Sequence, residues 1–269
     1  MKTTYLICFI ALSFTVASCQ WGVPKKAAEA TTEHDTLAYT YKSVHERAAD
    51  CGNKPDSGCT VVKIKYPVFT GQQKLNDSVV RNLTSLFAMD GRRDTSIELM
   101  TKNFLKSYTD FKKTDPRSAM YFDLDLYATV LFQDSSLTAL GVGGYTFQGG
   151  AHGSSATFFI NWDTKANKNI RLDDLFKPDY HDQLKAIAEK LFRKSEKLND
   201  TASLARDYFF KDNKFALNDN FSVTPTGLKF VYNQYEIKPY AAGITTLVIP
   251  YSPIKSLLRP NTVVAKYIK

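Results

Sequence analysis

Apolar and polar residues alternate along much of the chain, and this period of two predicts β-strands with one buried face. In the first half, the alternation runs through residues 36–46, 61–66, 119–133, 137–147 and 151–162. In the second half, shorter strands are expected over residues 215–217, 220–225, 227–232, 243–250 and 263–267. Both halves are therefore expected to contain a sheet.

Apolar residues at helical spacing separate the strands in each half. Asn76 and Asp77 can cap one helix in the first half, and a second helix is expected from about Ser96. In the second half, helices are expected to begin at Asp173 and to cover residues 180–197, 199–210 and 253–258. The order β-β-α-α-β-β-β in the first half predicts an antiparallel sheet with its helices on one face.

These elements predict an α+β fold made of two antiparallel-sheet-plus-helix subdomains. Residues 36–155 are expected to form the N-terminal domain and residues 156–269 the C-terminal domain. The composition, 43% hydrophobic and 13% aromatic, is sufficient to build a core in each.

The N-terminal residues have the pattern of a bacterial lipoprotein signal peptide, expected over residues 1–18. Lys2 is followed by an apolar run, residues 5–16, and then by Val-Ala-Ser-Cys19, which has the form of a lipobox. The apolar run is too short to span a bilayer. The alternative is an ordinary signal peptide with an incidental cysteine, but the small residues directly before Cys19 favour acylation of that cysteine. The protein is then expected in the bacterial cell envelope, lipid-anchored and either on the outer membrane or facing the periplasm.

Polar residues 19–35 are expected to form a tether, because they have no apolar period with which to bury a face. The formal charge of the whole chain is +8, and removal of Lys2 leaves +7 (8 − 1). The basic residues are scattered and do not alternate with aromatic ones, so nucleic-acid binding is not expected. The positive charge can still attract anionic lipids, acidic polymers or acidic proteins.

Two cysteines remain after the signal peptide and Cys19 are set aside. Cys51 and Cys59 flank a turn-forming segment rich in Gly, Asn, Pro and Asp. In an oxidising envelope they are expected to form a disulfide. The alternative, a two-thiol metal site, has no other soft ligand nearby in the sequence, so neither a metal nor a cofactor is expected.

The segment 145–153, Tyr-Thr-Phe-Gln-Gly-Gly-Ala-His-Gly, places three glycines around one histidine between two expected strands. Glycine in such a context marks a tight bend or a close backbone approach. Two interpretations stay open for His152. It can form part of a ligand site, or it can be a structural residue at a glycine-rich corner of a sheet.

The motifs of most common enzymes are absent from the sequence. It has no phosphate-binding Gly-Lys-Ser/Thr loop, no His-Glu-x-x-His and no Gly-x-Ser-x-Gly elbow. A binding module is therefore favoured over an enzyme. The competing hypothesis is a carbohydrate-active or other hydrolase that uses His152 with Ser154 or Asp125.

A succession of short motifs resembles a known domain. The motifs are Gly-Gly-Ala-His-Gly (149–153), Asn-Trp-Asp (161–163), Leu-Asp-Asp-Leu-Phe (172–176), Tyr-Asn-Gln-Tyr-Glu-Ile (232–237), Pro-Tyr-Ala-Ala-Gly (239–243) and Ile-Pro-Tyr (249–251). This succession resembles the C-terminal domain of unknown function in lysozyme-sensing, RsiV-type anti-sigma factors and in many bacterial envelope lipoproteins. Upstream, Tyr-Pro-Val-Phe-Thr-Gly (66–71), followed by Leu75 and Asn76, resembles the domain that precedes some peptidoglycan deacetylases.

The resemblance implies a ligand in the envelope, either a peptidoglycan-like polymer or a lysozyme-like protein. It extends over about residues 61–254, where the deacetylase catalytic domain and the membrane helix of the anti-sigma factors have no counterpart. Because common lysozymes are basic, a chain of charge +7 repels them at long range, and the polymer is favoured. The residues expected to contact the ligand are Tyr145, Phe147, Gln148, His152, Tyr235 and Tyr240.

The lipobox leads to a direct prediction. Metabolic labelling with a palmitate analogue should tag the wild-type protein and leave the Cys19→Ala variant unlabelled, because the acyl chains are added at that cysteine. Equal labelling of the two proteins would rule out the anchor.

Overall fold

A six-stranded sheet forms the first part of the structure, a computed structural model that describes residues 36–88 and 92–268. Its strands lie in chain order and are β1 (Tyr39–Arg47), β2 (Val61–Phe69), β3 (Asp123–Gln133), β4 (Leu137–Phe147), β5 (Ser154–Asp163) and β6 (Lys168–Asn169). All neighbouring strands are antiparallel except β2 and β3, which run parallel. A parallel pair needs a long crossover, and two helices provide it here.

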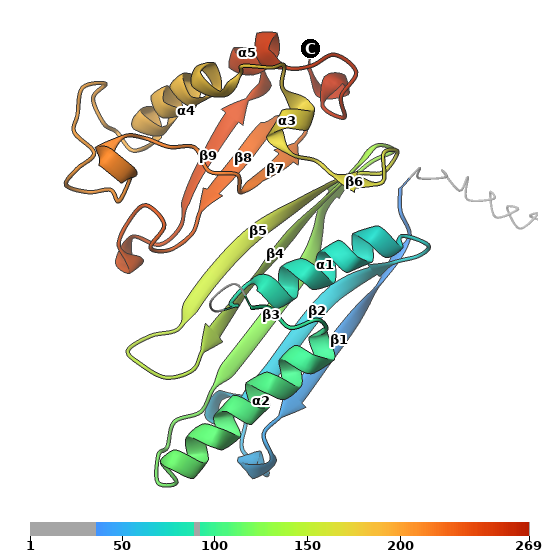
Figure 1. Ribbon diagram of the computed structural model, residues 1–269, viewed down its shortest axis with the longest axis vertical. Coiled ribbons are helices and arrows are strands. Elements are labelled where there is room, and N and C mark those ends of the chain that lie inside the picture. The colour runs from blue at the N-terminus through green and yellow to red at the C-terminus, as the bar shows by residue number, and fades with distance from the viewer. Residues whose placement is uncertain (1–35, 89–91, 269) are drawn as a thin grey trace, which may run out of the picture. The chain divides into compact units, whose positions relative to one another are not determined.

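These helices, α1 (Gln73–Ser85) and α2 (Ile97–Thr114), cover one face of the sheet, as Figure 1 shows. The Ser96 side chain accepts a hydrogen bond from the Leu99 amide at 3.1 Å and caps α2. Asn76 does not cap α1, which begins three residues earlier. Instead, its amide group binds the amide and the carbonyl of Phe69 at 2.8 and 2.9 Å, which ties α1 to the end of β2.

A hydrophobic core fills the space between this sheet and its helices. Aliphatic and aromatic side chains from every layer contribute to it, including Val62, Ile64, Phe69, Leu75, Val79, Leu83, Phe104, Leu126, Val142 and Ile160. The α+β class and the placement of the helices on one face of the sheet are therefore confirmed.

A three-stranded antiparallel sheet forms the second part. Its strands are β7 (Phe221–Thr224), β8 (Gly227–Tyr232) and β9 (Thr245–Pro250), and its helices are α3 (Leu172–Leu175), α4 (His181–Ser195) and α5 (Tyr251–Ile254). The helix expected over residues 199–210 does not form, nor do the strands expected over 215–217 and 263–267. The apolar spacing in 199–217 has another origin, because Tyr208, Phe210 and Phe215 pack around Phe192 of α4.

Strand β5 extends the first sheet beyond the expected domain boundary. Residues 156–163, assigned from the sequence to the second domain, pair with β4 in continuous register from Ser154 to Asp163. The six-stranded sheet therefore continues to β6, and the described residues lie in one compact unit.

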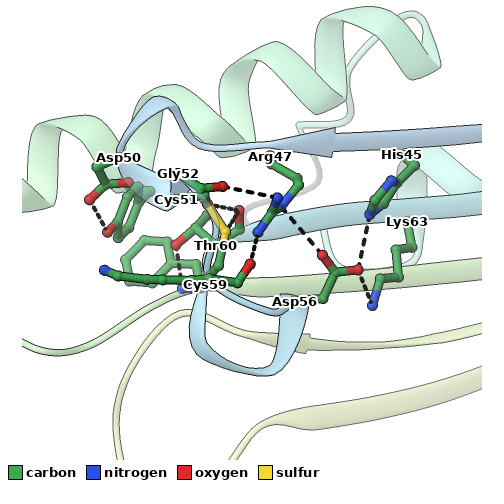
Figure 2. The surroundings of a disulfide bond; sticks show 12 residues. His45, Arg47, Asp50, Cys51, Gly52, Asp56, Cys59, Thr60 and Lys63 are labelled. Atoms are coloured by element: carbon green, nitrogen blue, oxygen red, sulfur yellow. Dashed lines mark hydrogen bonds and ion pairs between the residues drawn. A yellow bond between two sulfur atoms is a disulfide. The ribbon is translucent and has the colours of Figure 1, made fainter.

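The turn between β1 and β2 contains a disulfide between Cys51 and Cys59, whose Cα atoms are 5.4 Å apart (Figure 2). Both cysteines are buried. Beside them, Asp56 lies 3.0 Å from His45 and 3.0 Å from Lys63, and hydrogen bonds with these two side chains hold the pKa of Asp56 below its usual value. The turn is thus closed by a covalent bond and bordered by ion pairs.

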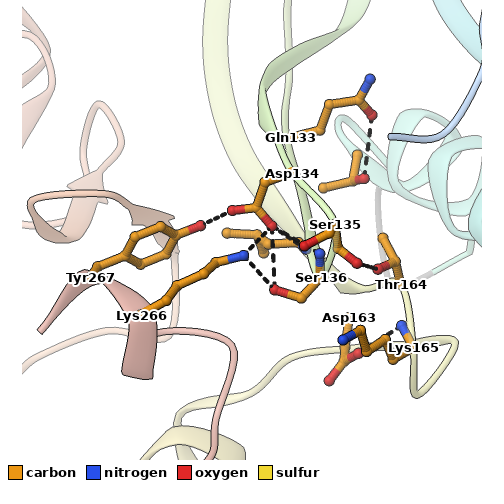
Figure 3. A network of polar contacts seen from close by, with 11 residues as sticks. Gln133, Asp134, Ser135, Ser136, Asp163, Thr164, Lys165, Lys266 and Tyr267 are labelled. Atoms are coloured by element: carbon orange, nitrogen blue, oxygen red, sulfur yellow. Dashed lines mark hydrogen bonds and ion pairs between the residues drawn. The ribbon is translucent and has the colours of Figure 1, made fainter. Parts of the chain in front are cut away.

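The end of the chain returns to the β3–β4 turn. Asp134 accepts hydrogen bonds from the Ser136 amide at 2.9 Å, from the Lys266 ammonium and from the Tyr267 hydroxyl (Figure 3). Burial alone would raise the pKa of Asp134, but the hydrogen bonds from Lys266 and Tyr267 outweigh it and lower that pKa. We refer to Asp134, Lys266 and Tyr267 as the carboxyl-terminal clasp.

Asn161 of β5 joins the two sheets and is 2% exposed. Its side-chain amide donates to the Phe221 carbonyl at 2.8 Å and accepts from the Val223 amide at 2.7 Å. One side chain therefore pairs with β7 much as a neighbouring strand would.

Asn161→Ala should cost about 2–4 kcal/mol of unfolding free energy, because it leaves a buried carbonyl and a buried amide without partners. Urea unfolding at pH 7 measures the change. Asn103→Ala is the matched control, since this exposed amide donates only to Asp94, and a loss below about 0.5 kcal/mol is expected there. Equal losses in the two variants would contradict the role given to Asn161.

The clasp should make stability depend on pH. Because the pKa of Asp134 is lowered in the folded state, its contribution is present above the unfolded pKa of about 3.9 and is lost as pH falls through the lower folded value. Asp134→Asn should cost about 1 kcal/mol at pH 7, and the difference from wild type should shrink as the pH falls from about 5 to about 2. Asp200→Asn, in an exposed turn, should show no such pH-dependent difference.

Candidate functional site

The outer edge of β5 is only partly covered by another strand, because β6 pairs with Trp162 and Asp163 alone. Side-chain amides satisfy the edge further along. Thr157 donates its amide to Asn233 at 2.8 Å, and its carbonyl accepts from Asn220 at 2.8 Å and from Asn233 at 3.1 Å. Unpaired backbone groups at a sheet edge readily pair with other chains, so these asparagines protect the edge.

A cavity of about 620 Å³ runs beside this edge, and we refer to it as the amide groove. It lies between β5, the end of α1 and the loops before β7 and after β8. Its lining combines five amide side chains, three aromatic ones and two carboxylates, namely Asn82, Asn218, Asn220, Asn233, Gln234, Phe87, Phe158, Phe159, Asp219 and Glu236. Phe158 is 40% exposed and offers a ring to a ligand.

Two amide oxygens of the groove have no partner among the described residues, whereas those of Asn218 and Asn233 accept from the Asn220 and Thr157 amides. Asn220 donates to the Thr157 and Val231 carbonyls, while its Oδ1 has no hydrogen-bond partner among the described residues. The Oε1 atom of Gln234 likewise has none. Buried acceptors of this kind favour a ligand that brings hydrogen-bond donors, such as hydroxyl or amide N–H groups.

Four of the aromatic residues singled out in the sequence come together next to the groove. His152 stacks on Tyr240 with ring centroids 3.9 Å apart, and its Nε2 lies 3.2 Å from the Tyr235 hydroxyl. The Tyr145 ring packs against Gly153 so closely that a Cβ atom there would lie 2.3 Å from it. We refer to Tyr145, His152, Tyr235 and Tyr240 as the aromatic cluster.

Backbone geometry positions the cluster. Gly149 and Gly150 have φ values of 103° and 94°, which only glycine adopts easily, and they turn the chain between β4 and β5. Tyr235 has φ of 64°, uncommon for a large side chain, within a turn closed by a hydrogen bond from the Glu236 amide to the Asn233 carbonyl. Since Gly153 and Tyr235 are chain neighbours of Ser154 and Gln234, which line the groove, the cluster adjoins it.

The histidine has a defined tautomer when neutral. Its Nδ1 lies 3.0 Å from the Gly153 carbonyl, which can only accept, so Nδ1 carries the hydrogen and Nε2 accepts from the Tyr235 hydroxyl. Among the described residues, neither Ser154 nor Asp125 is hydrogen-bonded to His152. In the strand register, Asp125 lies opposite Lys63 and Tyr145.

Burial and nearby charge shift the pKa values of Tyr145, a member of the cluster, and of Asp123. Burial, then the charge of Asp123 and the neighbouring Tyr240, raise the pKa of Tyr145. Burial also raises the pKa of Asp123, with a further contribution from Asp125.

Two of the expected contact residues lie apart from the cluster. Phe147 pairs with Asp123 at the end of β4. Gln148 lines a separate cavity of about 230 Å³ beside α1 and α2. The bend at Gly149 and Gly150 separates these two side chains from His152 on the following segment.

Two families match different parts of the chain. Residues 53–155 match the family described as "Deacetylase PdaC", and residues 173–252 match the one described as "Protein of unknown function (DUF3298)". The chain carries both domains. Their order agrees with the expected two-domain layout, and the deacetylase-associated match ends within β5 while the DUF3298 match begins in α3.

Solved structures share this fold. A DUF3298-family member from Bacteroides fragilis is 23% identical with a TM-score of 0.65, and the match covers 86% of this chain and 97% of that one. A DUF3298-family protein from Pseudomonas aeruginosa PAO1 is 22% identical with a TM-score of 0.68, over 85% and 97% of the two chains. No curated protein matches the chain. At these identities the likeness establishes the fold.

The sequence did not single out the asparagines of the groove. Asn218 stands between two expected strands and Asn220 at the start of the second, and Asn233 and Gln234 were part of a family motif without an assigned role. Their common property is that they line one strand edge, which becomes visible only in three dimensions. Within residues 36–88 and 92–268, no three His, Cys, Asp or Glu residues gather as metal ligands, and no helix has the length and hydropathy needed to cross a bilayer.

Proposed function

We propose that this protein is a non-catalytic lipoprotein of the bacterial envelope that binds a peptidoglycan-like glycan in the amide groove. The lining of the groove is the observation that supports this function most strongly. Sugars carry many hydroxyl and acetamido groups, and amide side chains both donate to and accept from such groups.

The amide oxygens without a partner make the groove complementary to the hydrogen-bond donors of a sugar. Asn220 Oδ1 and Gln234 Oε1 have no partner among the described residues, so sugar hydroxyls or acetamido N–H groups would satisfy them. The exposed ring of Phe158 supplies an apolar surface for the C–H face of a sugar ring. A groove about 620 Å³ in volume is large enough for several sugar residues.

The aromatic cluster would extend this surface. The stacked rings of His152 and Tyr240 and the nearby Tyr235 offer rigid, partly exposed aromatic faces with polar edges. Aromatic side chains of this kind lose little conformational entropy on binding and serve as anchors in many interfaces.

The proposed location rests on the sequence, because Cys19 lies outside the described residues. Acylation of Cys19 would hold the protein on a membrane, and the tether would let the folded unit reach the wall. The disulfide between Cys51 and Cys59 is compatible with an oxidising compartment. The lysozyme-sensing role of the RsiV-type anti-sigma factors makes a lysozyme-like protein the competing partner.

A co-sedimentation assay tests the function. Purified full-length protein should sediment with insoluble peptidoglycan at both low and moderate salt, because the groove contacts are hydrogen bonds and not ion pairs. The Phe158→Ala/Gln234→Ala variant should bind roughly tenfold more weakly, the loss of about 1.4 kcal/mol expected when an aromatic anchor is removed.

Leu131→Ala is the matched control, since Leu131 is 53% exposed and packs on Gly141, away from the groove. It should bind like the wild type. Retention on immobilised lysozyme without binding to peptidoglycan would support the competing partner and reject the glycan. Binding that disappears at moderate salt for every variant would indicate nonspecific attraction by the net charge.

A further inference from the structure

A second cavity, about 430 Å³ in volume, adjoins the amide groove. The two cavities share Phe159 and Asp219 in their linings, so they lie next to each other. The second cavity differs in chemistry, because it adds a cation, Arg171, and a further carboxylate, Asp173, to the shared Asp219. We refer to it as the charged pocket and define it by Arg171, Asp173, Tyr180, His181 and Asp219.

Two carboxylates at the start of α3, those of Asp173 and Asp174, differ in how far the protein itself occupies them. Asp174 binds the Arg171 backbone amide at 2.8 Å and the Lys168 ammonium at 2.5 Å, so its carboxylate is occupied within the protein. The neighbouring Asp173 accepts a hydrogen bond from the Tyr180 hydroxyl at 3.0 Å. Its side chain is nevertheless 75% exposed, and the other carboxylate oxygen can reach a ligand.

Two carboxylates face the same tyrosine. Burial, the hydrogen bond to Asp173 and the charges of Asp173 and Asp219 all raise the pKa of Tyr180. His181 stacks on the Tyr180 ring, with centroids 4.1 Å apart, and its Nε2 is 4.0 Å from Asp173. The buried Tyr180 therefore fixes the direction of the Asp173 carboxylate, while Asp219 makes no hydrogen bond or ion pair with the described residues.

The charged pocket also contains a cationic side chain, that of Arg171. Arg171 lines the pocket, and its guanidinium makes no side-chain hydrogen bond within the described residues. A guanidinium presents a planar fork that suits a carboxylate, whereas a carboxylate pair suits an ammonium group. The pocket can therefore recognise both charges of a zwitterion, a group that an unsubstituted neutral glycan lacks.

We propose that the charged pocket binds the peptide branch of a peptide-bearing glycan whose sugars occupy the amide groove. Arg171 would bind a carboxylate of the branch, and Asp173 with Asp219 would bind an ammonium group. This assignment rests on the proposed function and adds which part of the polymer is recognised. The shared wall at Phe159 and Asp219 is where the branch would leave the sugar backbone.

The experiment compares two soluble probes on the full-length protein by isothermal titration calorimetry. One probe is a peptidoglycan-derived oligosaccharide that keeps its peptides, and the other is the same oligosaccharide after the peptides are removed. The wild type should bind the peptide-bearing probe about tenfold more tightly, the gain expected from two charge-assisted contacts in a partly exposed pocket.

The Arg171→Gln/Asp173→Asn variant should bind both probes with the affinity that the wild type has for the bare oligosaccharide. Asp173→Asn keeps side-chain size, Arg171→Gln leaves a shorter polar side chain, and the new amide at 173 can still accept from Tyr180. The matched control is Asp182→Asn/Lys185→Gln, which removes the same two charges from the exposed face of α4 and should keep the tenfold preference. Thermal unfolding of each variant checks that the fold is intact.

The outcomes separate this inference from the function on which it rests. If the wild type binds the two probes equally, the peptide subsite is wrong and glycan binding stands. A tenfold preference that survives in the Arg171/Asp173 variant also overturns the subsite. If the wild type binds neither probe, the proposed function fails and the subsite fails with it.

Discussion

The backbone N–H and C=O groups at the outer edge of β5 need hydrogen-bond partners. The way in which these partners are supplied determines how the two sheets join and where the amide groove lies. A full-length neighbouring strand would be the usual solution, but β6 pairs only with Trp162 and Asp163. Further along, asparagine amides take its place, with Asn220 and Asn233 on Thr157. Asn161 makes the reciprocal arrangement and pairs with β7. The two sheets are therefore joined by side-chain amides, and no strand is shared between them.

The same residues create the groove. An asparagine that donates both of its hydrogens to backbone carbonyls, as Asn220 does, keeps its oxygen for another partner. Protection of the edge and presentation of acceptors are thus two results of one set of contacts. A strand in this position would have satisfied the edge equally well, but its backbone would have filled the space that the cavity occupies.

Local sequence signals predicted much of the fold. The apolar pattern located β2 to β5, although β4 is buried on both faces from Leu137 to Gly143, and Ser96 preceded α2 because its side chain caps the first turn. The parallel pairing of β2 with β3 was not predictable from these patterns, since it depends on how the α1–α2 crossover returns the chain. Residues 199–210 gave a false helical signal because their aromatic residues pack around Phe192 from an irregular segment.

Some residues of the candidate site were likewise predictable from the sequence, and others were not. His152 and Tyr145 were recognisable because nearby glycines mark a constrained bend, and Tyr240 because it follows Pro239. The roles of Asn220 and Asn233 arise only from contacts to Thr157, 63 and 76 residues away in the chain. No local period or motif records a contact of that length, so the groove could not be located from the sequence.

The dependence of β5 on distant asparagines has a consequence for the order of folding. A chain that emerges amino-terminus first can complete β1 to β5 and the disulfide turn while Asn220 and Asn233 are still absent. During that interval the edge of β5 is a hydrogen-bonding template without its cover, available to the same edge of another molecule. The most aggregation-prone species of this protein should therefore be the nascent chain that ends between β6 and β7, and rapid arrival of the last fifty or so residues, ~20% of the chain, closes the interval.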